Sequence, residues 1–174
     1  ESPMALEAAG FSYDSTFGYN DAVGFRGGTA QAFCPANVEN LLELPLGVQD
    51  TALFYPRRMN LSETEAGESC QQVIEMTSFF GGALTVNWHT RSLSPERLWG
   101  DFYASLLKQI QDKGAWFGTA ADIVMWFRTR RALRFEQVRR SEDGLYLKIS
   151  GSHPGSHPPF LIRVHHAQSG HAMS

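Results

Sequence analysis

Charged residues, cysteines and long apolar runs are all scarce in this sequence of 174 residues. The net charge is −3, so the basic surface on which nucleic-acid binding depends is not expected. No stretch approaches the ~18 consecutive apolar residues of a membrane-spanning helix. The sequence therefore predicts neither a nucleic-acid partner nor a membrane span.

The two cysteines, Cys34 and Cys70, have no metal-site spacing and are too few for a disulfide framework. We expect free thiols, with Cys70 on the buried face of a helix, and the cellular compartment stays open. Aromatic residues, in contrast, are abundant, with twelve Phe, five Tyr and four Trp. Such rings fill a bulky core or line a sugar-binding groove, and core packing is the more common reason.

Strand and helix signals alternate along most of the chain. Ser62 and Glu65 form a capping-box pattern, Gly81 and Gly82 end the helix that follows, and Ser94 with Pro95 is typical of another helix start. The expected elements are a helix over 2–9, strands over 11–16 and 41–46, a helix over 62–79, a strand over 83–88, a helix over 94–114, a strand over 115–117, a helix over 119–132, a hairpin of 133–140 with 145–150, and a strand over 160–166.

The alternation over 41–132 predicts parallel β/α units, and the segment 133–166 predicts an antiparallel β extension. Residues 167–174 are expected to be a frayed tail. The fold class is therefore α/β, with a partial β/α barrel over 1–132. Because this array begins with the tail of a helix, at Glu1, it lacks its opening strands, and we expect an upstream segment that supplies them.

Two short segments carry the functional signal. Residues 24–29 contain Arg26, and residues 84–89 are strand-forming residues that end at His89. In an α/β barrel the ends of the strands are where catalytic groups collect. A competing pattern, His153 and His157, has the spacing of a metal-binding helix turn, but Pro154 and Gly155 lie between them, so an ordinary loop is expected.

In this order, residues 13–19, 24–29, 44–46 with Asp50, 84–89 and 114–117 resemble the C-terminal half of polysaccharide deacetylases of the NodB-homology type. The resemblance covers residues 11–139. It implies a deformed β/α barrel and metal-dependent hydrolysis of N- or O-acetyl groups from an acetylated carbohydrate. It also implies a divalent metal, zinc by preference, in the full-length protein. The family's Asp-Asp and His-x-x-x-His metal motifs do not occur at the head of this chain, so this segment is expected to bind no metal by itself.

The resemblance assigns catalytic positions to Arg26, Asp50 and His89. Arg26 matches the arginine that positions the catalytic aspartate; its alternative is an ion pair with Asp14 or Asp21. His89 matches the general acid, and its alternative is a strand-end histidine bonded to backbone. Asp50 is expected to hold the His89 ring and to raise its basicity.

Substrate contacts are expected from Trp88, Asn87 and Tyr19. The rings of Trp88 and Tyr19 can stack on a sugar, although core packing is the more common use of such rings. Asn87 stands where the family has a leucine that walls the acetyl pocket.

Three interpretations of the function of this chain remain open. The first is a catalytic part of a deacetylase, the second is a non-catalytic carbohydrate-binding or pseudoenzyme module, and the third is a structural half that pairs with a separate N-terminal half. Retention of Arg26 and His89 favours the first, and Asn87 favours the second slightly.

Overall fold

The computed structural model describes residues 2–151 and 158–164, and the chain divides into two compact units, Glu1–Phe127 and Arg128–Ser174. His153 and His157, as well as the histidines of the final ten residues, lie outside the described residues. None of the described helices combines the length and apolar character that a membrane crossing requires.

The strands of the first unit pair in parallel, as the alternation of elements predicts. β1 (Tyr13–Asp14) pairs with β2 (Leu42–Glu43), and β3 (Leu46–Gln49) pairs with β4 (Thr85–Asn87). The expected single strand over 41–46 is thus two strands, because Pro45 between them has no N–H to donate to a ladder. Within the described residues these sheets are small and none is closed, so the partial barrel stays a prediction.

Two helices connect β3 to β4, which makes the β–α–β arrangement that parallel pairing requires. α2 (Asp50–Phe54) follows β3 directly, and α3 (Glu63–Phe80) leads to β4. The capping box of α3 is confirmed: the Ser62 N–H donates to the Glu65 carboxylate at 2.9 Å, and the Glu65 N–H donates to Ser62 Oγ at 3.4 Å. α3 ends at Gly81, whose φ of 74° favours glycine.

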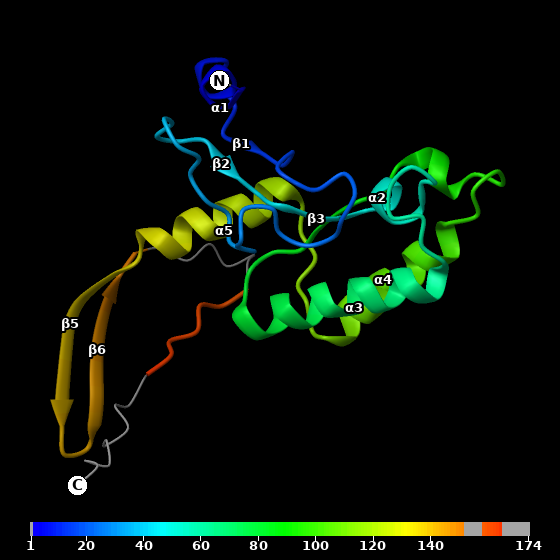
Figure 1. Ribbon diagram of the computed structural model, residues 1–174. Helices are drawn as coiled ribbons and strands as arrows, with labels where there is room; N and C mark the ends of the chain where they lie inside the picture. The colour runs from blue at the N-terminus through cyan, green and yellow to red at the C-terminus, as the bar shows by residue number, and fades with distance from the viewer. Residues whose placement is uncertain (1, 152–157, 165–174) are drawn as a thin grey trace, which may run out of the picture. The chain divides into compact units, whose positions relative to one another are not determined.

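The helix expected from Ser94 begins later, at α4 (Gly100–Asp112), which packs beside α3 (Figure 1). A 3₁₀ helix, η1 (Thr90–Leu93), and a turn precede it. Ser94 does not cap a helix because its hydroxyl donates back to the Arg91 carbonyl at 2.7 Å. Leu98 has a φ of 57°, a left-handed conformation that no α-helix can run through.

Two further helices of the described residues lie near the start of the chain and before the hairpin: α1 (Ser2–Ala8) and α5 (Ala120–Ala132). Thr119 and Asp122 exchange hydrogen bonds at the start of α5, which confirms the predicted cap. The strand expected over 115–117 does not form, because within the described residues no ladder joins this segment to another strand.

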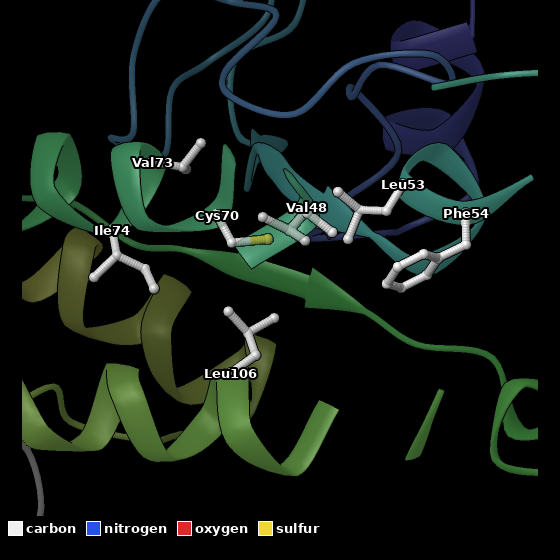
Figure 2. Close-up of a cluster of buried hydrophobic side chains, with 8 residues drawn as sticks. Val48, Leu53, Phe54, Cys70, Val73, Ile74 and Leu106 are labelled. Atoms are coloured by element: carbon white, nitrogen blue, oxygen red, sulfur yellow. The ribbon is translucent and has the colours of Figure 1, made fainter. Parts of the chain in front are cut away.

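Two buried clusters hold the first unit together. The larger lies between β3, α2, α3 and α4 and includes Cys70, which confirms its predicted place on the buried face of α3 (Figure 2). Burial raises the pKa of the Cys70 thiol to about 12. The smaller cluster joins β2 to α5 through Leu42, Leu44, Val124 and Phe127.

The second unit contains the predicted hairpin, β5 (Arg134–Ser141) paired antiparallel with β6 (Gly144–Ser150). Every residue of β5 is exposed. Of the third strand predicted over 160–166, residues 160–164 form no strand, and residues 165 and 166 lie outside the described part of the chain.

Candidate active site

The candidate site lies where β3 and β4 end together. Gln49, the last residue of β3, is in register with Asn87, the last residue of β4. Parallel strands present their carboxyl ends at one edge of a sheet, and polar groups that follow such ends converge there. Asp50 follows β3 immediately and His89 follows β4 by two residues, so the fold brings these two predicted residues into contact.

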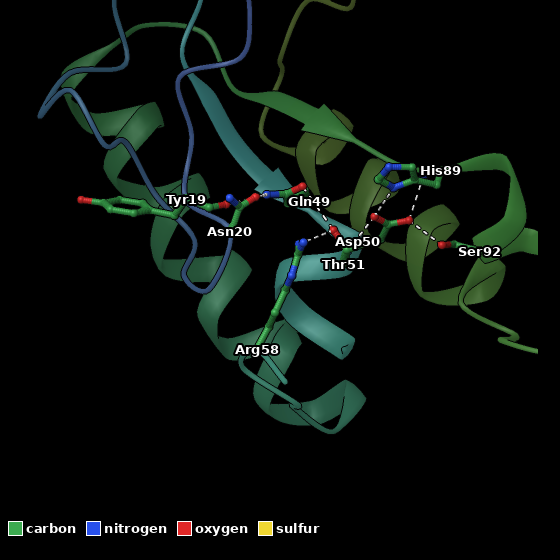
Figure 3. A network of polar contacts seen from close by, with 8 residues as sticks. All are labelled: Tyr19, Asn20, Gln49, Asp50, Thr51, Arg58, His89 and Ser92. Carbon is green, nitrogen blue, oxygen red and sulfur yellow. Dashed lines mark hydrogen bonds and ion pairs between the residues drawn. The ribbon is translucent and has the colours of Figure 1, made fainter. Parts of the chain in front are cut away.

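The Asp50 carboxylate accepts four hydrogen bonds, two on each oxygen (Figure 3). Oδ1 is 2.7 Å from His89 Nδ1 and 2.6 Å from the Thr51 backbone nitrogen. Oδ2 accepts from the His89 backbone N–H at 2.8 Å and from Ser92 Oγ at 2.5 Å. The side chain of Asp50 is 0% exposed, whereas that of His89 is 38% exposed.

These donors keep Asp50 ionised inside the protein. Burial by itself raises the pKa of a carboxyl group, but the hydrogen bonds from Ser92, His89 and Thr51 outweigh it, and the pKa of Asp50 lies below its usual value. Because a carboxylate can only accept, His89 Nδ1 must carry the hydrogen that joins the pair. The tautomer is thereby fixed, and Nε2 is the nitrogen left to exchange a proton with a ligand.

Ser92 belongs to the site but was not among the predicted residues. It is fully buried within η1, and its hydroxyl reaches Asp50 across 42 residues of sequence. The only local signal is a serine three residues after a histidine in a polar turn. That signal is too common to have identified Ser92 without the fold.

A polar network extends from Asp50 along the strand end (Figure 3). The Gln49 side chain donates to the Tyr19 carbonyl at 2.5 Å, and its amide oxygen accepts from Thr51 Oγ1 at 3.2 Å. Arg58 Nη1 donates to the same Thr51 hydroxyl at 2.7 Å. Tyr19 therefore joins the network through its backbone, while its ring points away from Asp50 and His89 in this view.

Arg26 is not part of this cluster. Its exposed guanidinium lies 5.0 Å from the centre of the Phe17 ring. Among the described residues it forms no ion pair, either with Asp14 or Asp21 or with Asp50. The role toward a catalytic aspartate that the resemblance gives to Arg26 stays a prediction.

The two remaining predicted contacts differ in their surroundings. The Trp88 ring is stacked on Tyr103 at 5.0 Å and on Phe102 at 5.9 Å, against the larger buried cluster. This packing favours the core interpretation of Trp88, and sugar stacking stays a prediction. Asn87 is exposed at the end of β4, beside the site.

The described residues do not supply a metal site at Asp50 and His89. The residues that the structure describes contain no group of three or more His, Cys, Asp or Glu side chains that could hold a metal ion, so they do not fit the metal that the resemblance implies. A cavity of about 180 Å³ lies at the opposite end of β4. Its lining is Ile74, Thr77, Ser78, Gly81, Gly82, Leu84, Ile110, Lys113 and Ala115.

No protein-family model, no curated protein and no solved structure matches this chain. A buried carboxylate that fixes an accessible imidazole is an arrangement suited to general acid or base catalysis.

Proposed function

We propose that this chain is the C-terminal part of a carbohydrate deacetylase, which hydrolyses N- or O-acetyl groups with His89 as general acid. The observation that carries the proposal is the contact between the buried Asp50 carboxylate and His89 Nδ1 at 2.7 Å. A structural histidine needs no ionised buried partner, whereas a proton-transferring imidazole gains a fixed tautomer and orientation from one.

The residues of this chain have distinct roles in such a reaction. Departure of an amine or alcohol from the tetrahedral intermediate requires a proton, and His89 Nε2 supplies it. Asp50 holds the ring in place and compensates the positive charge that the imidazole carries before transfer. Ser92 and the Thr51 N–H keep Asp50 oriented and ionised.

A divalent metal, when bound, would polarise the acetyl carbonyl and activate the attacking water. Because the described residues do not provide its ligands, the proposal includes an upstream half of the same fold as a required partner. The steps assigned to this chain are limited to the positioning of the leaving group and the transfer of its proton.

A second candidate is a carbohydrate-binding or pseudoenzyme module without catalytic activity. The observation that favours it is that Arg26 forms no ion pair with Asp50 among the described residues. Measuring the intact mass of the native gene product separates the cases first. A mass above 19.4 kDa, with both metal motifs in the added segment, supports the deacetylase, and a mass equal to this chain supports the module.

The activity test uses the native gene product, loaded with zinc, and measures acetate release from acetylated chitin, xylan and polyuronate oligomers. We expect release from at least one of them, and a roughly 10²–10⁴-fold lower turnover for His89→Gln with little change in binding. Lys108→Gln, an exposed change on α4, is the matched control. Undiminished turnover in His89→Gln would remove His89 from the mechanism, and binding without acetate release would favour the module.

A further inference from the structure

Three arginine side chains gather around one tyrosine beside the candidate site. The guanidinium carbons of Arg97, Arg58 and Arg91 lie 4.8, 5.5 and 5.9 Å from the centre of the Tyr55 ring. Arg97 is also 5.2 Å from the centre of the Trp99 ring. An aromatic ring has two faces, so at least two of these three cations lie over the same face of Tyr55.

The residues that build the Asp50–His89 pair also place this cluster. Tyr55 follows the last residue of α2, the helix that Asp50 begins. Arg91 and Arg97 lie on the turn between His89 and α4, which Ser92 fixes at two points: its hydroxyl donates to Asp50, and its carbonyl accepts from the Trp99 N–H at 3.1 Å. Short stretches of chain, fixed by these hydrogen bonds, thus connect the cluster to Asp50 and His89.

The charge of the cluster is not balanced by the protein. Among the described residues none of the three arginines forms an ion pair. The pKa of Glu96 is lowered chiefly by its hydrogen bond with Ser94 and only to a smaller extent by the charge of Arg97. Glu96 is exposed, and its carboxylate stays more than 4 Å from the guanidinium nitrogens of the described arginines.

Several guanidinium donors are also unused. Arg97 Nη1 is buried and has no hydrogen-bond partner among the described residues. Arg58 uses Nη1 for Thr51, which leaves most of the five N–H groups of its guanidinium for another acceptor. One guanidinium on an aromatic ring is ordinary packing, but three unpaired ones repel each other unless an anion lies between them.

We propose that Arg58, Arg91 and Arg97 form an anion-binding subsite, called the arginine subsite, which takes a carboxylate, phosphate or sulfate group carried by the polysaccharide. This inference rests on the proposed function, because it names the class of substrate: an anionic rather than a neutral acetylated polysaccharide. Guanidinium groups suit this task because their planar donors match carboxylate and phosphate oxygens.

The binding test needs no catalysis. The native gene product is titrated calorimetrically with inorganic phosphate, with an oligogalacturonate, with a phosphorylated oligosaccharide and with a neutral chito-oligosaccharide of equal length. We expect one of the anionic oligosaccharides to bind most tightly, and inorganic phosphate to compete with it. Arg91→Gln and Arg97→Gln should each weaken that binding about tenfold, the size of a partly exposed charge-assisted hydrogen bond.

Two variants protect the test from misfolding. Arg91 is exposed, and it bonds to Ser94 through its backbone carbonyl, which Arg91→Gln keeps, so this variant tests the subsite even if Arg97→Gln does not fold. Arg139→Gln, an exposed arginine of the hairpin, is the matched control and should bind every probe as the unchanged protein does. The affinity for the anionic oligosaccharide should fall with added salt, and less steeply in Arg91→Gln.

The kinetic test compares KM for an acetylated polyuronate oligomer and an acetylated neutral oligomer. In Arg91→Gln the KM for the anionic oligomer should rise about tenfold relative to the KM for the neutral oligomer. Loss of anionic binding in the arginine variants without any acetate release would support the arginine subsite and overturn the proposed reaction. Acetate release with equal binding of neutral and anionic oligomers, unchanged in both variants, would overturn the arginine subsite and leave the reaction standing.

Discussion

Glu43 is the last residue of β2 and Asp50 follows β3 immediately, and both are buried, with exposures of 4% and 0%. Their ionisation nevertheless differs. The pKa of Glu43 is raised, chiefly by burial and with a contribution from the nearby Asp14 charge. The pKa of Asp50 is lowered, although burial opposes that direction.

The difference comes from the donors around each carboxyl group. Asp50 accepts four hydrogen bonds. For Glu43, the hydrogen bond that lowers the pKa most is the one from the Phe17 backbone N–H, at 2.9 Å. Burial disfavours an ionised acid, so a buried carboxylate persists only where the fold supplies such donors. The concentration of donors on Asp50 distinguishes it from Glu43, and it is why we propose that the chemistry lies at the β3 end.

The largest expected effect on stability is that of Asp50→Asn. The amide keeps one acceptor oxygen but turns an NH₂ group toward donors that now lack a partner. We expect the free energy of unfolding to fall by about 3 kcal/mol, and turnover to fall with it because the His89 tautomer is no longer fixed. Urea unfolding at neutral pH measures the free energy of unfolding. Asp21→Asn, on an exposed loop, is the matched control, and an equal loss in both variants would contradict the role of the buried donors.

In the acid range, the free energy of unfolding should rise with pH because of Asp50. Because its pKa is lower in the folded state, the unfolded chain binds more protons below the ordinary carboxyl value, and stability there rises with pH. The contribution of Asp50 is thus fully present above the unfolded pKa of about 4 and is lost as the pH falls through the folded value.

Ser92→Ala tests this assignment, because it removes one donor and nothing else from Asp50. The pKa of Asp50 should rise toward its ordinary value, so the acid-induced loss of stability should be smaller and should be complete at a higher pH. Stability at neutral pH should fall by about 1–2 kcal/mol. Unfolding free energies measured across the acid range for both proteins give the difference, and two parallel curves would show that Ser92 does not hold the charge of Asp50.

The features that sequence could predict are those that local signals determine. The capping box at Ser62 rests on neighbouring residues, and α3 follows from it. The contact between Asp50 and His89, which are 39 residues apart, was expected from the family resemblance and not from a local signal. The helix start at Ser94 failed because a tertiary constraint overrides the local signal: Ser92 is bonded to Asp50, and the chain turns at Leu98.

The arginine subsite has the same origin in tertiary structure. Arg58 comes from the segment after α2, and Arg91 and Arg97 come from the turn before α4. The three arginines come together over the Tyr55 ring only when β3 and β4 pair, because this pairing places both segments at one edge of the sheet. No spacing in the sequence encodes this convergence, so it was not predictable from residues alone.

The smallest expected effect, and the one of opposite sign, is that of Glu43→Gln. Because the pKa of Glu43 is raised in the fold, its contribution to stability is present below the unfolded carboxyl pKa and is lost as the pH rises through the folded value. At neutral pH the burial of the Glu43 carboxyl group is therefore a cost to stability, and the amide removes this cost while its oxygen can still accept from the Phe17 N–H. We expect a gain of about 0.5–1 kcal/mol in the free energy of unfolding. Glu39→Gln, an exposed change on the preceding loop, should have almost no effect. A loss of stability in Glu43→Gln would mean that hydrogen bonds stabilise the ionised form of Glu43 as they do that of Asp50. The contrast that places the chemistry at Asp50 would then disappear.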